Sequence, residues 1–224
     1  MLGGPSVRFW VGEGVNPTLP RFVQVLGTGS GPFTPPASSF TIPVAHSMTA
    51  GNNVVVVVFS LTHHVLTITD SLTNAYTLTA SLNTTGIFSV GRSHPHTALS
   101  AGDTITVTYT GAPNFSLGAA LEFHKLTGVD SYIFPRTTQP LYTVKVPVNY
   151  ENDMIVAMEE AQGHTTTDVT LKPVSPFISR IQVVQPVPVS PVTLSIATYV
   201  SPTTGTVTAK WVTPGSLGAV SFTS

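Results

Sequence analysis

The clearest pattern in this chain is an alternation of apolar and polar residues. In one segment the apolar residues Ile105, Val107 and Tyr109 alternate with threonines, which predicts a strand with one buried face. Residues 76–82 alternate in the same way, whereas residues 54–59 are apolar throughout and predict a strand buried on both faces. Turn residues interrupt such segments at short intervals, and no window has the period of an amphipathic helix. The chain from about residue 39 is therefore predicted to be an all-β, antiparallel two-sheet sandwich.

Four short segments recur in the same order about 100 residues later, which indicates an internal duplication. The pairs are FTIPV at Phe40 with YTVKV at Tyr142, NNVVVVV at Asn52 with NDMIVAM at Asn152, TITVTYT at Thr104 with TVTAKWV at Thr206, and SLGAALEF at Ser116 with SLGAVSF at Ser216. The predicted halves are residues 39–128 and 139–224. They could form one large sandwich with a pseudo-twofold axis or two small sandwiches in tandem. The short connection between them favours the single sandwich with a shared core.

Residues 1–38 differ from the rest of the chain. They are rich in glycine and proline, which disfavours a long helix or a central strand, and we expect an extended N-terminal arm. Its large aromatic residues, Phe9, Trp10, Phe22 and Phe33, are candidate assembly contacts. They could anchor the arm in the protein's own body or in the groove of a neighbour. We expect deletion of the whole arm to leave the sandwich folded.

Charged residues make up only 8% of the chain, against about 25% in an ordinary domain, and the formal net charge is -1. Nine scattered cations cannot neutralise a nucleic-acid backbone, so we expect no nucleic-acid partner. The absence of cysteine excludes disulfides and zinc-thiolate sites. No apolar run approaches the roughly 20 residues of a membrane-spanning helix, and the first residues lack the pattern of a secretory signal. We therefore expect no membrane partner.

Histidines are the first candidates for metal binding, and the chain has seven. His94 and His96 would share one face of a strand, where a third ligand such as His124 could complete a zinc or nickel site. Pro95 between them favours a loop or an edge strand. The internal repeat does not preserve the histidines. We therefore expect neutral polar residues in loops and no metal site.

The acidic residues offer no catalytic pair in the sequence. Glu159 and Glu160 are adjacent, so on a strand they point to opposite faces and cannot act together as general acid and base. Asp70 and Asn74 could contribute to a calcium site, but a turn capped by side chains explains them more simply. The chain has no G-x-S-x-G motif and no phosphate-binding glycine loop. We predict no enzyme activity, no catalytic residues and no cofactor.

Several turn and strand motifs are shared with a known module. TDSLTNAYTL at Thr69, SAGDTITVTYTGAP at Ser100 and SLGAALEFHKLTGVD at Ser116 resemble a β-sandwich module that recurs in phage virion proteins and in large secreted bacterial proteins. The resemblance covers residues 40–224 and leaves the arm out. In the family pattern a glycine often precedes the Asn of the D-S-x-G-N-x-Y turn, where this chain has Thr73. The resemblance implies a jelly-roll-like or lectin-like sandwich used for display or attachment, and it carries no activity.

The expected function is that of a non-enzymatic structural protein of a phage or virus-like particle, as a decoration, minor capsid or tail component attached partly through the arm. Its partners would be the major capsid or tail protein and further copies of itself, in the virion. A carbohydrate- or receptor-binding module of a tail fibre or adhesin, at a cell surface, is the alternative. That alternative needs exposed aromatic residues such as Trp10, whereas Trp211 lies on the apolar side of an alternating strand and is expected in the core.

Overall fold

The structure, a computed structural model, consists of antiparallel strands connected by turns. It describes residues 18–31, 38–80, 87–113, 115–135, 141–162, 176–185 and 191–224. Within these ranges every regular element is a strand, and none is a helix long and apolar enough to cross a membrane. The strands are β1 (Arg21–Gly31), β2 (Ser39–Pro43), β3 (Asn53–Ser60), β4 (Val65–Asp70), β5 (Thr77–Ala80), β6 (Ile87–Ser93), β7 (Thr104–Tyr109), β8 (Ser116–His124), β9 (Gly128–Ile133), β10 (Leu141–Val148), β11 (Asp153–Gln162), β12 (Ile178–Gln185), β13 (Val192–Ser201) and β14 (Gly205–Thr223).

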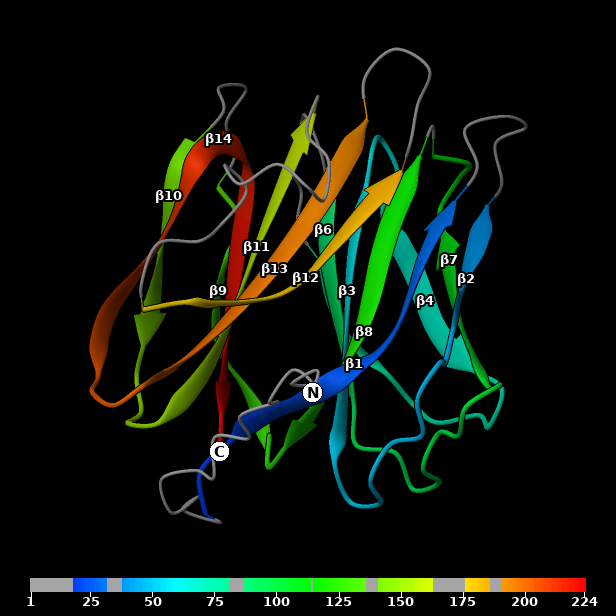
Figure 1. Ribbon diagram of the computed structural model, residues 1–224, viewed down its shortest axis with the longest axis horizontal. Coiled ribbons are helices and arrows are strands. Elements are labelled where there is room, and N and C mark those ends of the chain that lie inside the picture. Colours follow the sequence, from blue (N-terminus) through cyan, green and yellow to red (C-terminus); the bar gives the residue numbers. More distant parts are fainter. Residues whose placement is uncertain are drawn as a thin grey trace, which may run out of the picture.

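Two large sheets pack face to face at the centre of the molecule. The first has the order β1-β8-β3-β6-β5, and the second has the order β10-β14-β11-β13-β12, with β9 also paired to β14. Figure 1 shows the first half, blue to green, beside the second half, yellow to red. Between the sheets lies the central core, which includes Val55, Val57 and Phe59 of β3 and Met154, Val156 and Met158 of β11. The predicted antiparallel all-β sandwich is confirmed, and buried residues of both halves meet in the central core.

A smaller layer covers the outer face of each large sheet. In the first half the sheet β2-β7-β4 encloses the first outer core, which contains Ile42 and Val107. In the second half β10 and the beginning of β14 enclose the second outer core, which contains Val144 and Trp211. Trp211 is fully buried, as its place in the alternating strand predicts. The molecule therefore has four layers, and each half also closes on a core of its own.

The strand β3 lies between two cores, which explains its unbroken apolar sequence. Val54, Val56 and Val58 point into the first outer core, and the residues between them point into the central core. All of these side chains are buried, as predicted. By contrast, β7 buries only Ile105, Val107 and Tyr109, because its other face is turned away from the core.

The internal repeat matches the structure directly in the outer layers. FTIPV lies in β2, which pairs with β7, and YTVKV lies in β10, which pairs with the first part of β14. The matched residues Ile42 and Val144 are both buried in outer cores, as are Tyr109 and its counterpart Trp211. Alternation along these strands fixes which residues point inward, so matched residues face the same way, although the pairing of the two strands differs by two residues between the halves.

In the large sheets the sequence match is displaced by one residue from the structural match. The match of NNVVVVV with NDMIVAM pairs Val54 with Met154, yet Val54 points to an outer core and Met154 to the central core. The structural counterpart of Val54 is Ile155. Both residues point into an outer core, and each pairs with the residue that comes just before the last phenylalanine of the neighbouring strand. Strands that are apolar on both faces carry no alternation, so the sequence could not reveal the shift.

Part of the expected arm belongs to the sandwich. Residues 21–31 form β1, an edge strand that pairs with β8 and buries Leu26 completely. Its glycines serve close packing, since a Cβ atom at Gly27 or Gly29 would collide with main-chain oxygens of β2. The arm therefore does not extend to residue 38, and deletion of all residues up to 38 would remove this strand, so we expect it to destabilise the sandwich.

The turn after β4 confirms the capped turn predicted around Asp70. The carboxylate of Asp70 accepts hydrogen bonds from the main-chain nitrogens of Leu72 and Asn74, at 2.9 and 3.0 Å, and from the side chains of Asn74 and Tyr76, at 2.8 and 3.1 Å. These donors occupy both oxygens. Within the turn Thr73 has a φ of 61°, the left-handed conformation that favours glycine.

Replacement of Thr73 by glycine is therefore expected to stabilise the protein by about 1 kcal/mol, because a left-handed β-branched residue is strained. The midpoint of urea unfolding measures the change. The matched control is Thr69→Gly on the exposed side of β4, which should lower stability, since a glycine inside a strand costs conformational entropy. A Thr73→Gly protein that unfolds at a lower urea concentration than the parent would contradict the assigned backbone strain.

Candidate functional site

Most of the acidic residues are buried. The structure describes eight of the ten, and five of these have less than one tenth of their surface exposed. The buried five are Asp70, Glu122, Asp153, Glu159 and Glu160. Burial of a carboxylate costs free energy unless the group is hydrogen-bonded or protonated. The surroundings of each of the five therefore show whether the interior supplies hydrogen-bond donors or favours the protonated form. The sequence singled out none of them as buried.

Glu122 on β8 is enclosed by donors of the first half. Its carboxylate accepts hydrogen bonds from the side chain of Gln24 at 2.6 Å, from the main-chain nitrogen of Thr49 at 2.9 Å and from the side chain of Asn52. The other end of the Asn52 amide contacts the ring of His124 at 3.0 Å. This network joins three segments at one end of the sheet. All of its hydrogen bonds are made within the protein, and both oxygens of Glu122 are occupied by them.

The corresponding place in the second half carries a carboxyl pair. Asp153, at the start of β11, accepts a hydrogen bond from Ser221 at 3.2 Å, and its second oxygen is buried without a donor among the described residues. Asp130 lies at a bulge of β9 and is held by the main chain and side chain of Asn149, at 3.0 and 2.8 Å. Burial, and then the adjacent carboxyl of Asp130, raise the pKa of Asp153 to about 6. The two adjacent carboxyl groups therefore favour the form of Asp153 that keeps its proton.

Glu159 and Glu160 occupy the inner part of β11 on opposite faces, as their adjacency predicts. Both oxygens of Glu159 are buried without a hydrogen-bond partner in the described part of the chain. Burial, followed by the nearby charge of Glu160, raises the pKa of Glu159 to about 9. Burial also raises the pKa of Glu160 to about 7, against the lowering effect of a hydrogen bond with Ser216. At neutral pH Glu159 is therefore uncharged.

These raised pKa values make stability depend on pH. Each group binds its proton more tightly in the folded protein than in the unfolded chain, so the free energy of unfolding falls as the pH rises. For Glu159 the fall extends from its ordinary pKa of 4.5 to about 9, at about 1.4 kcal/mol per pH unit. Urea unfolding at about pH 5, 7 and 9 measures the slope. Glu159→Gln should flatten it above neutral pH.

The matched control for this experiment is Glu151→Gln, which removes an exposed carboxylate from the turn before β11. It should leave the slope unchanged, because ionisation of an exposed carboxylate costs about the same free energy in the folded protein as in the unfolded chain. Equal slopes in the parent and in Glu159→Gln would show that Glu159 does not hold a proton in the folded state.

The histidines do not form a metal site in the described part of the chain. His94 and His96 are both exposed, and no group of three or more His, Asp or Glu side chains there could hold a metal ion. His124 belongs to the Glu122 network instead. The rings of His63 and His64 are half-buried near the turn after β7, where the ring of His63 lies against Gly111. His164 lies outside the described residues.

The expected assembly contacts divide into two groups. Phe22 on β1 packs edge to face on Phe123, with ring centroids 5.7 Å apart, and lies beneath the guanidinium of Arg180 from β12. It therefore contacts the body of the protein itself. Phe9, Trp10 and Phe33 lie outside the described residues.

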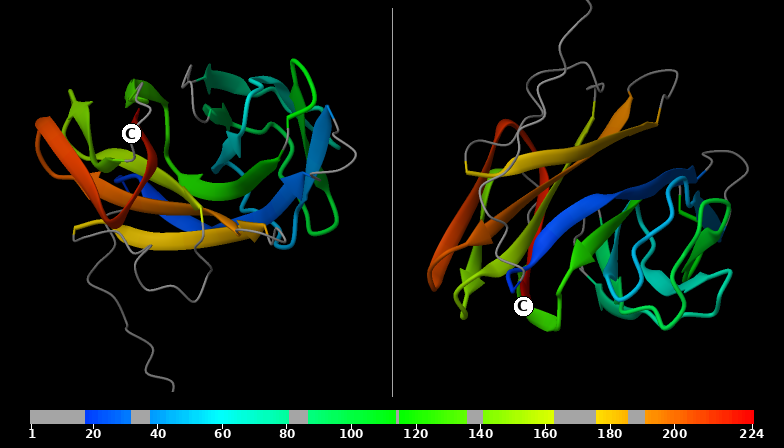
Figure 2. Two further views of the ribbon diagram at one scale, coloured as in Figure 1. Left: turned by 90° about the horizontal axis from the view of Figure 1, so that it is seen from above. Right: turned by 60° about the horizontal axis from the view of Figure 1, so that its bottom comes forward.

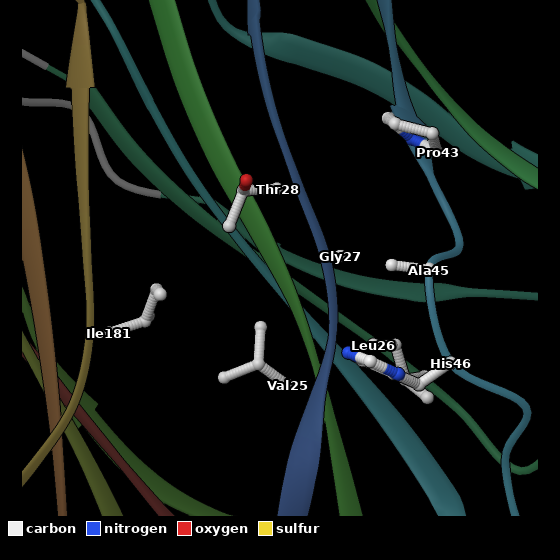
Figure 3. A pocket seen from close by; sticks show the side chains of 8 residues that line it. All are labelled: Val25, Leu26, Gly27, Thr28, Pro43, Ala45, His46 and Ile181. Atoms are coloured by element: carbon white, nitrogen blue, oxygen red, sulfur yellow. The ribbon is translucent and has the colours of Figure 1, made fainter.

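A shallow hollow of about 360 Å³ follows β1. Figure 3 shows Val25 and Thr28 directed toward Ile181 of β12, with Pro43, Ala45 and His46 on the other side of β1. The lining contains no carboxylate and no Lys or Arg. Such a surface can bury apolar groups of a partner, but it offers no pair of groups for acid-base chemistry.

Comparisons of the chain with protein-family models, with curated proteins and with solved structures found no match. The candidate surfaces are therefore judged by their own geometry.

Proposed function

We propose that the protein is a non-enzymatic structural component of a multi-protein particle, in which neighbouring subunits cover its surface. The distribution of acidic residues carries this proposal. Of the described carboxylates only Asp103, Asp130 and Glu151 remain outside the buried set. The described surface is thus poor in acidic groups, and the whole chain is poor in charge. Charged groups at the surface keep free proteins soluble and apart, so a surface with few of them suits a protein that is enclosed by partners.

Exposed apolar and aromatic side chains support the same proposal. Six large side chains have more than half of their surface exposed: Leu66, Tyr132, Tyr142, Tyr150, Ile178 and Val212. Single exposed apolar residues are ordinary, but here few charges separate them from further copies of the protein. Tyrosines are also favoured at protein interfaces, because they combine a large apolar ring with a polar end.

The residues before β1 are proposed to contribute to attachment. They lead directly into an edge strand, and among the described residues β1 has a strand partner on one side only. An exposed strand edge is a template for a strand from another chain. The motifs that resemble a virion module suggest a phage or virus-like particle, with this chain as a decoration, minor capsid or tail component. Its partners would be the major capsid or tail protein and other copies of itself.

Two truncations test this proposal. Deletion of residues 1–17 ends before β1 and should leave the unfolding midpoint unchanged, while weakening the self-association that we expect in sedimentation experiments. Deletion of residues 1–31 also removes β1 and the buried Leu26, and should destabilise the fold by at least about 3 kcal/mol. A full-length protein that stays monomeric at high concentration and does not bind isolated particles would contradict the proposed function.

A carbohydrate- or receptor-binding module remains the second candidate, and the tyrosines of the second half favour it. Tyr132 on β9 and Tyr150 after β10 belong to neighbouring segments, which are joined by a hydrogen bond from Ser131 to the carbonyl oxygen of Pro147. Aromatic rings at a surface can stack on sugars. This alternative predicts binding in a glycan array that is lost in Tyr132→Ala and Tyr150→Ala and retained in Leu66→Ala. An array without binding would contradict it.

A further inference from the structure

A second hollow, of about 270 Å³, lies where the two halves meet. The strand β12 packs there against β8 and β1, and Figure 2 shows these strands from two further sides. Arg21 and Phe22 of β1, Ile178 and Arg180 of β12, and Thr198 and Tyr199 of β13 line the hollow. Its walls therefore combine apolar surface with two of the six Lys and Arg residues that the structure describes.

Arg180 is held in a defined position. It is the unpaired residue of a bulge in β12, since Ser179 and Ile181 pair with consecutive residues of β13. Bulges redirect a side chain and are frequent beside binding sites. The Nε atom of Arg180 donates a hydrogen bond to Oγ1 of Thr198 at 2.6 Å, and the guanidinium carbon lies 4.4 Å from the centre of the Phe22 ring. Two contacts thus fix the guanidinium and leave its Nη groups available.

The charge of Arg180 is not balanced within the described part of the chain. Its side chain is half-buried, and no described carboxylate forms an ion pair with it or with Arg21. Burial lowers the pKa of Arg180, as expected for a cation that has lost water without gaining a counter-ion. Arg21 adds a second positive charge at the same hollow. An anion that binds at the hollow would offset both charges.

The two halves also meet at a second seam, near Phe88 and Phe134, and that seam shows that the fold does not require these arginines. By pairing with the neighbouring strand, Arg21 corresponds to Gly128 and Phe22 to Val129 at the start of β9. The second seam packs Phe134 against Phe88, with ring centroids 6.4 Å apart, and Gly128 and Val129 place no cation there. Among the described residues the basic pair is therefore a feature of one seam only.

We propose that this hollow binds a carboxylate ligand with a ring of about monosaccharide size. The Nη groups of Arg180 hold the carboxylate in a bidentate manner, and Arg21 adds charge at the rim. Ile178 and Val200, which also line the hollow, contact the ring. These apolar walls favour an organic carboxylate over inorganic phosphate, which has no apolar part to bury. The ring can come from an acidic sugar or from an aromatic acid, and the experiment distinguishes these sources.

Isothermal titration calorimetry on the full-length protein tests the proposal with six probes. Glucuronate and N-acetylneuraminate represent acidic sugars, benzoate and phenylacetate represent aromatic acids, and glucose and inorganic phosphate are the negative probes. We expect at least one of the four ring carboxylates to bind in preference to both negative probes. Preference for the first pair identifies an acidic saccharide, and preference for the second pair identifies an aromatic acid. Absence of binding by all four, or equally tight binding of phosphate or glucose, overturns the proposal.

Variants connect the binding to the arginines. Arg180→Gln should weaken binding at least about tenfold, because a charge-assisted bidentate contact is lost, and Arg180→Lys should restore only part of it. Arg21→Gln removes an exposed cation, should keep the fold and should weaken binding about threefold, with a smaller salt dependence. Lys210→Gln on β14 is the control with the same charge change at an exposed residue outside the hollow. Equal weakening by Lys210→Gln, or unchanged binding by a folded Arg21→Gln protein, would contradict the proposed site.

Discussion

The contact between the two large sheets imposes the main constraint on this molecule. Because β3 and β11 each lie between the central core and an outer core, almost every residue along them must be able to be buried. A buried aliphatic side chain contributes about 1.5–3 kcal/mol, so these strands account for much of the stabilising free energy. The outer layers face one core only and keep an alternating pattern. The whole arrangement of four layers follows from this difference between central and outer strands.

The acidic groups of β11 are exceptions within this apolar environment. By pairing and facing, Glu159 corresponds to Val58 of β3, and Glu160 corresponds to Phe59. Two core positions of the first half thus carry carboxyl groups in the second half, and burial raises the pKa of both. A protonated carboxyl can occupy such a position at a lower cost than a charged one. The halves have therefore kept their pairing while their interiors have diverged.

The divergence extends to the ends of the sheets and to the seams. Both halves have a bulge opposite the end of β8 or β14, at Val23 in β1 and at Asp130 in β9. In the first half this end carries Glu122 with a full set of donors, and in the second half Asp153 faces Asp130. The two halves have similar frames, and different residues at matching places make them chemically different. The seam that carries Arg21 and Arg180 is one result.

Local patterns in the sequence determined several elements correctly. The alternation of Ile105, Val107 and Tyr109, the apolar run in β3 and the turn at Asp70 each depend on neighbours in the chain, and each was found where predicted. The sequence did not distinguish β1 from an arm, because glycine signals both a loop and a close contact between strands. It also left open which face of β3 meets which core, since a strand that is buried on both faces has no period. Only the tertiary structure decided that face, and only it brought Asp130 to Asp153 and Phe22 to Arg180, because such contacts depend on how distant strands pack.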